Sequence, residues 1–117
     1  MPDDPELRRL LWFLLGGSRG GNNRARIIIR LHDKPSNQNQ LAGDLGVQYK
    51  AVQHHVRVLL RNSLVVGTGE KYGMTYSLSP WLESRIDIFL EICKKLRLNL
   101  TVETNRSQDG GGSIGGV

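Results

Sequence analysis

The sequence of 117 residues contains a single cysteine, Cys93. One thiol can form neither an intrachain disulfide nor a cysteine-pair metal site, and such sparse cysteine usage is typical of a reducing compartment. Aromatic side chains are also scarce, with two Phe, two Trp and three Tyr in the whole chain. A hydrophobic core of this composition has to be mostly aliphatic.

Long apolar runs are missing. The most apolar stretch, Leu10–Leu15, is short, whereas a membrane-spanning helix needs about 20 residues. The chain begins Met1-Pro2-Asp3-Asp4, which is acidic where a secretory signal peptide is basic. We therefore expect a soluble, cytoplasmic protein that has no membrane partner.

Sequence signatures of catalysis and metal binding are missing as well. There is no Gly-x-Ser-x-Gly motif, and the glycine-rich run 16–21 lacks the strand and the Gly-Lys-Ser/Thr of a phosphate loop. His54 and His55 are adjacent, and neighbours on a helix diverge by about 100°, which does not favour a shared metal ion. We expect no catalytic site, no metal and no cofactor.

Positive charge is what the sequence does have. Sixteen Lys and Arg outnumber eleven Asp and Glu, which gives a net charge of +5 and a pI near 9.8. A basic domain of this size suits a polyanionic partner, and charge alone does not choose between nucleic acid and an acidic membrane surface.

Hydrophobic spacing predicts a series of short helices followed by one hairpin, a mainly α fold with a small β-hairpin (α+β). Asn22 or Asn23 is expected to cap the second helix, and Ser36 or Asn37 the third, where Gln40 completes a capping box with Asn37. The predicted helices are Pro5–Leu15, Arg24–His32, a short one that stops at Gly46, Gln48–Asn62 and a last one that starts at Ser79-Pro80; the predicted strands are Leu64–Val66 and Met74–Leu78.

The first and last helices are strongly amphipathic. In the first, Trp12 and Phe13 fall partly off the leucine stripe, so they either contact a partner subunit or cover the edge of the chain's own core. We favour a homodimer in which both helices pair with their symmetry mates. The predicted interface residues are Leu7, Leu11, Trp12, Leu14, Ile86, Phe89, Leu90 and Cys93.

The most informative segment lies between residues 41 and 59. Its pattern is Leu41-Ala42, Leu45-Gly46-Val47, Val52, His55-Val56 and Leu59. A small side chain at Ala42 lets two helices cross closely, and Gly46 tolerates the positive φ that the turn needs. This is the spacing of a helix-turn-helix, whose second helix enters the major groove of DNA.

Together with a YK-x-V-x-HH segment (Tyr49 to His55) and a YG-x-x-Y-x-LS segment (Tyr72 to Ser79), this pattern resembles archaeal winged helix-turn-helix transcription regulators of the ArsR and MarR type. The resemblance covers about residues 7 to 96. It implies a winged helix with extra N- and C-terminal helices, binding to double-stranded DNA, and a homodimer. Metal sensors of the ArsR type carry cysteine pairs, so thiol-based metal sensing is not expected here.

The helical wheel indicates which side chains would face DNA. Gln53 and His54 lie in the middle of the outward face and are our candidates for base recognition, whereas His55 points sideways or inward and is expected to form a hydrogen bond within the domain. Arg19, Arg24, Arg26 and Arg30 form a second basic cluster that either contacts phosphate or keeps its helix solvated. The predicted DNA-binding residues are Gln48, Tyr49, Lys50, Gln53, His54, Arg57 and, at the wing tip, Lys71.

Three functions are compatible with these patterns. The favoured one is a dimeric, repressor-like transcription regulator that binds specific double-stranded DNA sequences; a small-molecule effector is left unspecified. The alternatives are a winged-helix module for protein interaction and a non-specific architectural DNA binder. Residues 1–98 would form the DNA-binding and dimerisation domain, and residues 99–117 a disordered glycine-rich tail.

Overall fold

Helices dominate the architecture, and a single hairpin accompanies them. The computed structural model describes residues 3–70 and 73–100. Its elements, in chain order, are α1 (Pro5–Leu11), the π-helical turn η1 (Trp12–Gly16), α2 (Gly21–Asp33), α3 (Gln38–Leu45), α4 (Tyr49–Arg61), β1 (Val65–Thr68), β2 (Thr75–Leu78), α5 (Pro80–Glu83) and α6 (Ile86–Leu96). The predicted mainly α fold with one hairpin is confirmed.

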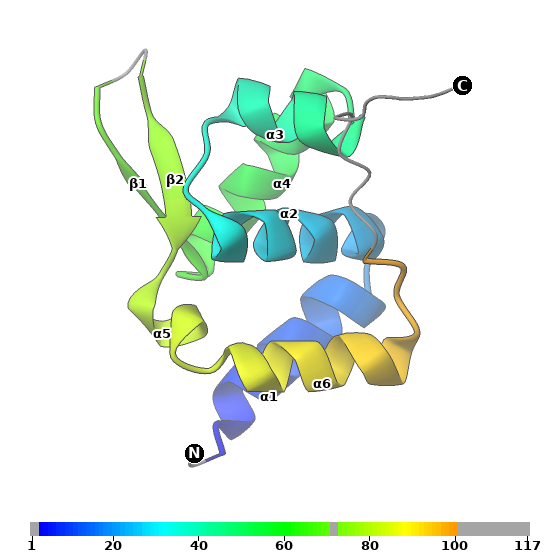
Figure 1. Cartoon of the computed structure of the whole chain (residues 1–117). Helices are drawn as coiled ribbons and strands as arrows, with labels where there is room; N and C mark the ends of the chain where they lie inside the picture. The colour runs from blue at the N-terminus through cyan, green and yellow to red at the C-terminus, as the bar shows by residue number, and fades with distance from the viewer. Residues whose placement is uncertain (1–2, 71–72, 101–117) are drawn as a thin grey trace.

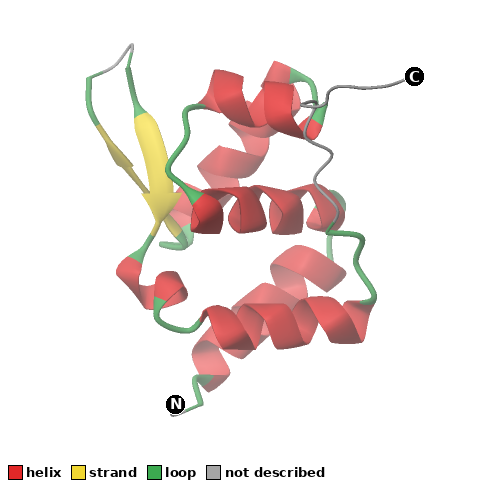
Figure 2. Cartoon of the chain, in the orientation of Figure 1, coloured by secondary structure: helices red, strands yellow, loops and turns green. Residues whose placement is uncertain are grey.

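Helix α2 lies at the centre of the molecule. It packs against α3 and α4 on one side, against η1 on another and against β2 near its C-terminal end. Figure 1 shows α3 and α4 on one side of α2, and α1 with α6 on the opposite side. The hairpin projects beside α2 and α3, as its yellow strands show in Figure 2. This arrangement separates the predicted helix-turn-helix from the two terminal helices.

The first helix does not continue regularly to Leu15, as the sequence predicted. It changes to the wider π-helical turn η1 at Trp12, a feature that often marks functional sites. The wider turn buries Leu14 and Leu15 side by side, while Trp12 and Phe13 remain 40% and 61% exposed. The backbone carbonyl of Leu14, which this irregular turn leaves without a regular helical partner, accepts a hydrogen bond from Arg24 at 2.8 Å.

Helix α2 also begins earlier than predicted. Its N-cap is Gly20, whose φ is +82°, and neither of the predicted asparagine caps occupies that position. Asn22 instead accepts a hydrogen bond from the backbone N–H of Asn99 at 3.0 Å, just after α6. The predicted tail from residue 101 onward lies outside the described residues, so the boundary at residue 98 remains a prediction.

Strands β1 and β2 pair in antiparallel register, with Val65 opposite Leu78 and Thr68 opposite Thr75. The first strand therefore starts one residue later than predicted and extends into the expected glycine-rich turn. Ser36, in the link between α2 and α3, forms an isolated bridge to Tyr76, with backbone N–O distances of 3.0 and 2.8 Å. This bridge joins the hairpin to the start of α3, a long-range contact that local sequence patterns do not reveal.

The last predicted helix is interrupted. Helix α5 ends at Glu83, and α6 begins at Ile86 after an N-cap residue, Arg85, whose φ is −125°. This break changes which side chains face inward, because Ile88 and Ile92 become buried while Leu90 stays 44% exposed. The predicted interface residues, which assumed one continuous helix, had included Leu90 and neither of these isoleucines.

The core is mostly aliphatic, as the composition predicted. Among the described residues, Phe89 is the only aromatic side chain buried in it. Leucine, isoleucine and valine from the helices and both strands fill the rest, together with Ala25 and Cys93. No helix in residues 3–70 and 73–100 combines the length and apolarity needed to cross a membrane.

Candidate nucleic-acid interface

The turn between α3 and α4 has the geometry that the sequence predicted. Asn37 caps α3: its side chain accepts the N–H of Gln40, and the Gln40 side chain accepts the N–H of Asn37, both at 2.8 Å. At the other end of α3, Gly46 adopts φ +65°, and an added Cβ there would meet no atom within 4 Å. Its positive φ lets the chain reverse and enter α4, so the backbone of this turn depends on glycine for conformation rather than for space.

The inner face of α4 fixes the orientation of the helix. Val52, Val56 and Leu59 are fully buried, at spacings of four and three residues. They pack into the same core as Leu41 and Leu45 of α3. Because one face of α4 is held in this way, the side chains on the opposite face must point to solvent.

That outer face carries the predicted base-recognition residues. Figure 1 shows α4 beside α3 and behind α2. Tyr49 is 44% exposed, and Gln48, which precedes the helix, makes no capping hydrogen bond with its side chain. Gln53 is half-buried. The remaining predicted residues of this face, Lys50, His54 and Arg57, are exposed. The structure therefore gathers six of the seven predicted DNA-binding residues on one helical surface.

The charge of this surface has one sign. No aspartate or glutamate occurs from Leu45 to Gly69, while Lys50, Arg57 and Arg61 lie in the same stretch. Asp44, at the end of α3, is neutralised by Arg30 of α2 at 2.6 Å. A polar helix face with cations and no carboxylates is electrostatically complementary to a phosphate backbone.

His55 faces the core, as expected, but not for the expected reason. It is 7% exposed, and its Nδ1 atom has no hydrogen-bond partner. Its ring lies directly against Gly20, where an added Cβ would overlap the Cε1 atom of the imidazole. Burial, followed by the nearby Arg24 and His54, lowers the pKa of His55. The histidine thus packs as a neutral side chain that positions α4 against the connection before α2.

Most arginines of the second basic cluster (Arg19, Arg24, Arg26 and Arg30) form hydrogen bonds or ion pairs within the domain. Arg24 is 6% exposed and donates to Leu14 O and to Ser18 Oγ, both at 2.8 Å. Arg26 donates to the carbonyl oxygen of Leu45 at 2.9 Å. Arg30 is paired with Asp44, as described above. Of the four arginines considered as phosphate ligands, only Arg19 is exposed.

The wing has fewer described candidates. Gly69 has φ +108°, and the backbone N–H of Gly73 donates to the carbonyl oxygen of Glu70 at 2.9 Å. These two features fix the backbone on either side of the wing tip. Lys71, the seventh predicted DNA-binding residue, lies outside the described residues. Its role remains a prediction from the sequence.

The predicted dimer residues divide into two groups. The larger group, which is buried within a single chain, contains Leu7, Leu11, Leu14, Phe89 and Cys93. In this conformation their apolar surface is already used by the chain's own core, because α1 and η1 pack on α6. Trp12 and Leu90 are 40% and 44% exposed, and Ile86 is half-buried. Phe13, which the sequence analysis considered with Trp12 as a partner contact or as a cover for the edge of the core, is 61% exposed.

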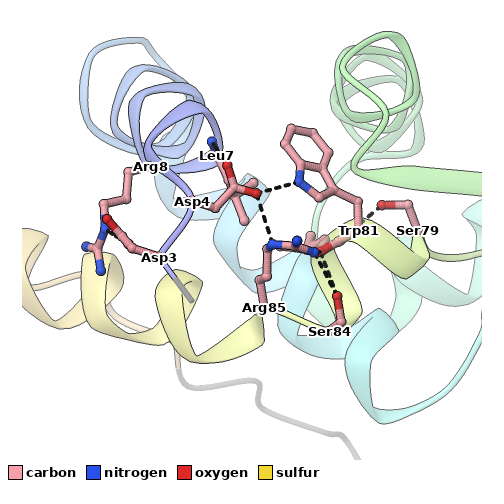
Figure 3. Close-up of polar contacts among 9 residues, drawn as sticks. Asp3, Asp4, Leu7, Arg8, Ser79, Trp81, Ser84 and Arg85 are labelled. Atoms are coloured by element: carbon pink, nitrogen blue, oxygen red, sulfur yellow. Dashed lines mark hydrogen bonds and ion pairs between the residues drawn. The ribbon is translucent and has the colours of Figure 1, made fainter. Parts of the chain in front are cut away.

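Hydrogen bonds and an ion pair connect Asp4, near the N-terminus, to α5 and to the start of α6. The sequence did not indicate these contacts. Figure 3 shows the Asp4 carboxylate between Trp81 and Arg85. It accepts hydrogen bonds from Leu7 N at 3.1 Å and from Trp81 Nε1 at 2.8 Å, and its Oδ2 lies 2.9 Å from Arg85 Nε. The first two of these contacts are the largest causes of the lowered pKa of Asp4.

A second set of charges joins α1 to α6. Arg8 makes two hydrogen bonds to the Glu91 carboxylate, at 2.9 and 3.1 Å, and its Nε contacts Asp3 at 2.6 Å. Lys95 Nζ lies 3.0 Å from the same Glu91 carboxylate. These contacts hold the two terminal helices in one arrangement relative to each other.

Residues 3–70 and 73–100 contain no group of three or more His, Cys, Asp or Glu side chains placed to hold a metal ion.

With this geometry established, the fold is that of a winged helix-turn-helix: α3 and α4 form the helix-turn-helix, and β1 and β2 form the wing. No family model matches the chain, and no curated protein matches it.

Solved structures do match. HlyU from Vibrio cholerae is 19% identical, with 75% of this chain and 90% of that chain covered and a TM-score of 0.57. The transcriptional regulator HlyU from Vibrio vulnificus gives the same values. A probable transcriptional regulator from Pseudomonas aeruginosa is 18% identical over 80% of this chain and 73% of that chain, with a TM-score of 0.59. At these identities, the likeness establishes the fold.

Proposed function

We propose that this protein is a transcription regulator that binds specific sequences of double-stranded DNA as a homodimer. The observation that carries the proposal is the outer face of α4, a carboxylate-free surface with exposed Lys50, His54 and Arg57. The structural neighbours described as transcriptional regulators support the same function. The proposal includes two finer points. The chain is related to archaeal regulators of the ArsR and MarR type, and it acts in the manner of a repressor.

The chemistry of this face suits base recognition in the major groove. A glutamine can bond bidentately to adenine, and lysine or arginine can bond to guanine. Gln53 and His54 occupy the middle of the helix, so we assign them to base edges. Tyr49, Lys50 and Arg57 flank them and contact either bases or phosphates.

A dimer would place two such helices on one face of DNA. The exposed apolar side chains Trp12, Phe13 and Leu90 belong to η1 and α6, two elements that pack against each other. We propose that they, with the half-buried Ile86, form the contact between subunits. Two recognition helices of a dimer then occupy half-sites separated by one turn of DNA, about 34 Å.

The first experiment is selection of bound duplexes from a random pool, followed by affinity measurements at several salt concentrations. Enrichment of a palindrome with half-sites about ten base pairs apart is the expected result. Salt-sensitive binding without enrichment would replace the proposal with an architectural DNA binder. Absence of binding would favour a winged-helix module for protein interaction.

Two charge variants test whether α4 forms the contact surface. Lys50→Gln should weaken binding and lower the slope of log K against log salt by about 1 if the lysine contacts a phosphate. Lys94→Gln is the matched control, because it removes the same charge from an exposed position on α6. Equal effects of the two variants would indicate a general electrostatic attraction and contradict the assignment to α4.

The recognition residue is tested by selectivity rather than by affinity alone. Gln53→Ala should reduce the preference for one base pair of the selected site, by about 1–3 kcal/mol if the side chain makes a bidentate contact. An unchanged preference at every position of the site would contradict the role assigned to Gln53.

The dimer is tested by sedimentation equilibrium at micromolar concentration. Leu90→Glu should shift the protein toward monomer because it places a charge in the proposed apolar contact. Glu83→Gln, an exposed change on α5, should leave the association unchanged. A wild-type protein that is monomeric under these conditions would refute the dimer.

A further inference from the structure

Two buried polar atoms without a hydrogen-bond partner lie where α4 meets the start of α2. They are Nδ1 of His55 and Nε of Arg24, and residues 3–70 and 73–100 contain no other buried side-chain nitrogen or oxygen in this condition. Both side chains are more than nine-tenths buried. Nearly all buried polar groups in proteins have a partner, so two exceptions at one contact call for a physical explanation.

The ring of His55 is enclosed by the connection before α2, residues 17–20. The imidazole atoms that lie nearest to a Cβ added at Gly20 are Cε1, Nε2 and Nδ1, so the polar edge of the ring faces this glycine. Gly20 caps α2 with φ +82°, and its carbonyl oxygen already accepts the backbone N–H of Arg24 at 3.0 Å. The contact therefore encloses the ring closely and offers Nδ1 no acceptor.

Arg24 places a fixed positive charge near this ring. Its Nη1 donates to the carbonyl oxygen of Leu14 and to Oγ of Ser18, both at 2.8 Å, which holds the guanidinium under η1. An arginine keeps its charge at every pH at which a histidine titrates. Because both side chains are buried, the repulsion between Arg24 and a protonated His55 is screened less than that between exposed groups.

No carboxylate on the described elements around α4 compensates for that charge. Helices α2 and α3 and strand β1 pack on α4, and β1 carries no titratable side chain. Apart from Arg24, the titratable side chains of α2, α3 and the connection before α2 are Arg19, Arg26, Arg30, His32, Asp33 and Asp44. Both carboxylates of this set pair with Arg30, at 3.3 and 2.6 Å. Burial, followed by Arg24 and by His54 of α4 itself, lowers the pKa of His55.

A proton on His55 therefore disfavours this contact in two ways. An imidazolium donates from both nitrogens, and Nδ1 has no acceptor in this position of the ring. The same proton adds a second positive charge close to Arg24. Movement of the ring away from Gly20 relieves both. Because His55 is enclosed by the core and belongs to α4, the ring moves together with the helix that carries the candidate DNA-binding residues.

We infer that His55 is a positioning residue for DNA binding, and that acid weakens the complex because the protonated ring no longer holds α4 against the connection before α2. This inference rests on the proposed function, in which DNA binds α4 in the position that the neutral ring maintains. The affinity for DNA should be complete above the pKa of His55 in the free folded protein, which lies below 6.5, and should fall as the pH drops through that value. One competing proton lowers the association constant by up to about tenfold per pH unit for each His55.

The movement of α4 is tested first without DNA, through the backbone amide resonances of two glycines in the labelled full chain. Gly20 reports on the ring, and Gly46, at the other end of α4, reports on the helix. Both resonances should titrate with one midpoint below pH 6.5, while far-UV circular dichroism stays native. A titration of Gly20 without one of Gly46 would show that the ring is protonated in place, and would overturn the inference, as would no titration at all.

Variants then assign the titration to this contact. His55→Asn should abolish it, whereas His32→Asn, the same change at an exposed histidine of α2 that contacts Glu83, should leave it unchanged. Arg24→Gln keeps a donor for Leu14 and removes the charge, so its midpoint should rise toward 6.5. The exposed His54→Gln leaves the buried contact intact, and its midpoint should rise by less. A titration that persists in His55→Asn, or midpoints that do not rise in the other two variants, would contradict the inference.

Finally, the association constants of the wild type and of His55→Asn for the selected duplex are compared from about pH 8 to pH 5 at fixed ionic strength. Their ratio cancels the contributions of other titrating groups, including His54 on the DNA face. The ratio of wild type to variant should fall in acid with the midpoint seen at Gly20. A constant ratio, or a fall that occurs only with loss of the helical signal, refutes the inference. If both glycines titrate but no DNA binds at any pH, the positioning of α4 stands and the proposed function fails.

Discussion

Two glycines with similar backbone angles but different surroundings allow a sharp test of how α4 is held. Gly20 has φ +82° and Gly46 has φ +65°, so alanine is strained at both positions. An added Cβ at Gly46 meets nothing within 4 Å, whereas at Gly20 it would overlap the ring of His55. The two Gly→Ala substitutions therefore share a conformational cost and differ in a steric one.

The magnitudes follow from these two contributions. The left-handed conformation costs an alanine about 1–2 kcal/mol, which is the whole expected loss for Gly46→Ala. Overpacking against a buried side chain adds about 1–3 kcal/mol, so Gly20→Ala should lose about 2–5 kcal/mol of the free energy of unfolding. The imidazole of His55 cannot simply rotate away, because the histidine is 7% exposed and belongs to α4.

Urea unfolding at one fixed protein concentration measures both losses. A double-mutant cycle adds His55→Ala, in which the ring is removed and the steric part of the Gly20→Ala penalty should disappear. The argument is refuted if Gly20→Ala and Gly46→Ala differ by less than about 0.5 kcal/mol, or if the cycle shows no coupling beyond that margin.

Three further predictions concern single side chains. Asn37→Ala, which removes the capping box of α3, should destabilise the protein by about 0.5–2 kcal/mol in urea, while the exposed Asn39→Ala should be nearly neutral. The lowered pKa of His55 means that the unfolded chain binds a proton more readily, so stability should fall as the pH drops below 6.5 toward the lower folded-state pKa. His55→Asn should remove that part of the pH dependence in unfolding titrations, and an unchanged profile would contradict it. Arg8, followed by Lys95, lowers the pKa of Glu91 from 4.5 to about 2, so the stability from these contacts should be complete above pH 4.5 and lost as the pH falls toward 2. Glu91→Gln should flatten the unfolding curve in that acid range, and a profile like that of the wild type would show that the pair does not stabilise the fold.

Much of the helix-turn-helix could be predicted because its determinants are local. The capping box of Asn37, the turn at Gly46 and the inward face of α4 depend on residues a few positions apart. A helical wheel anchored by Val52 and Val56 therefore places the outer residues on the exposed face without any knowledge of the rest of the chain. The single hairpin was predicted for the same reason, whereas the mostly aliphatic core followed from the composition of the chain.

Irregularities within the helices were not predicted. Periodicity assumes one repeat along a helix, whereas the π-helical turn after Leu11 and the break at Arg85 each change that repeat. The apolar side chains beyond these two points are affected: Ile88 and Ile92 are buried, while Trp12, Phe13 and Leu90 are exposed.

By itself, the sequence determined the class of the fold, the helix that carries the candidate DNA-binding residues and the basic character of that helix. Only the tertiary structure decided which charged side chains and aromatic rings are buried or paired, because their neighbours come from distant segments of the chain. It buried Arg24 under the π-helical turn and packed His55 on Gly20. The physical reason is that a polar side chain's role depends on its partners and its burial, and both are set by contacts between segments far apart in the chain.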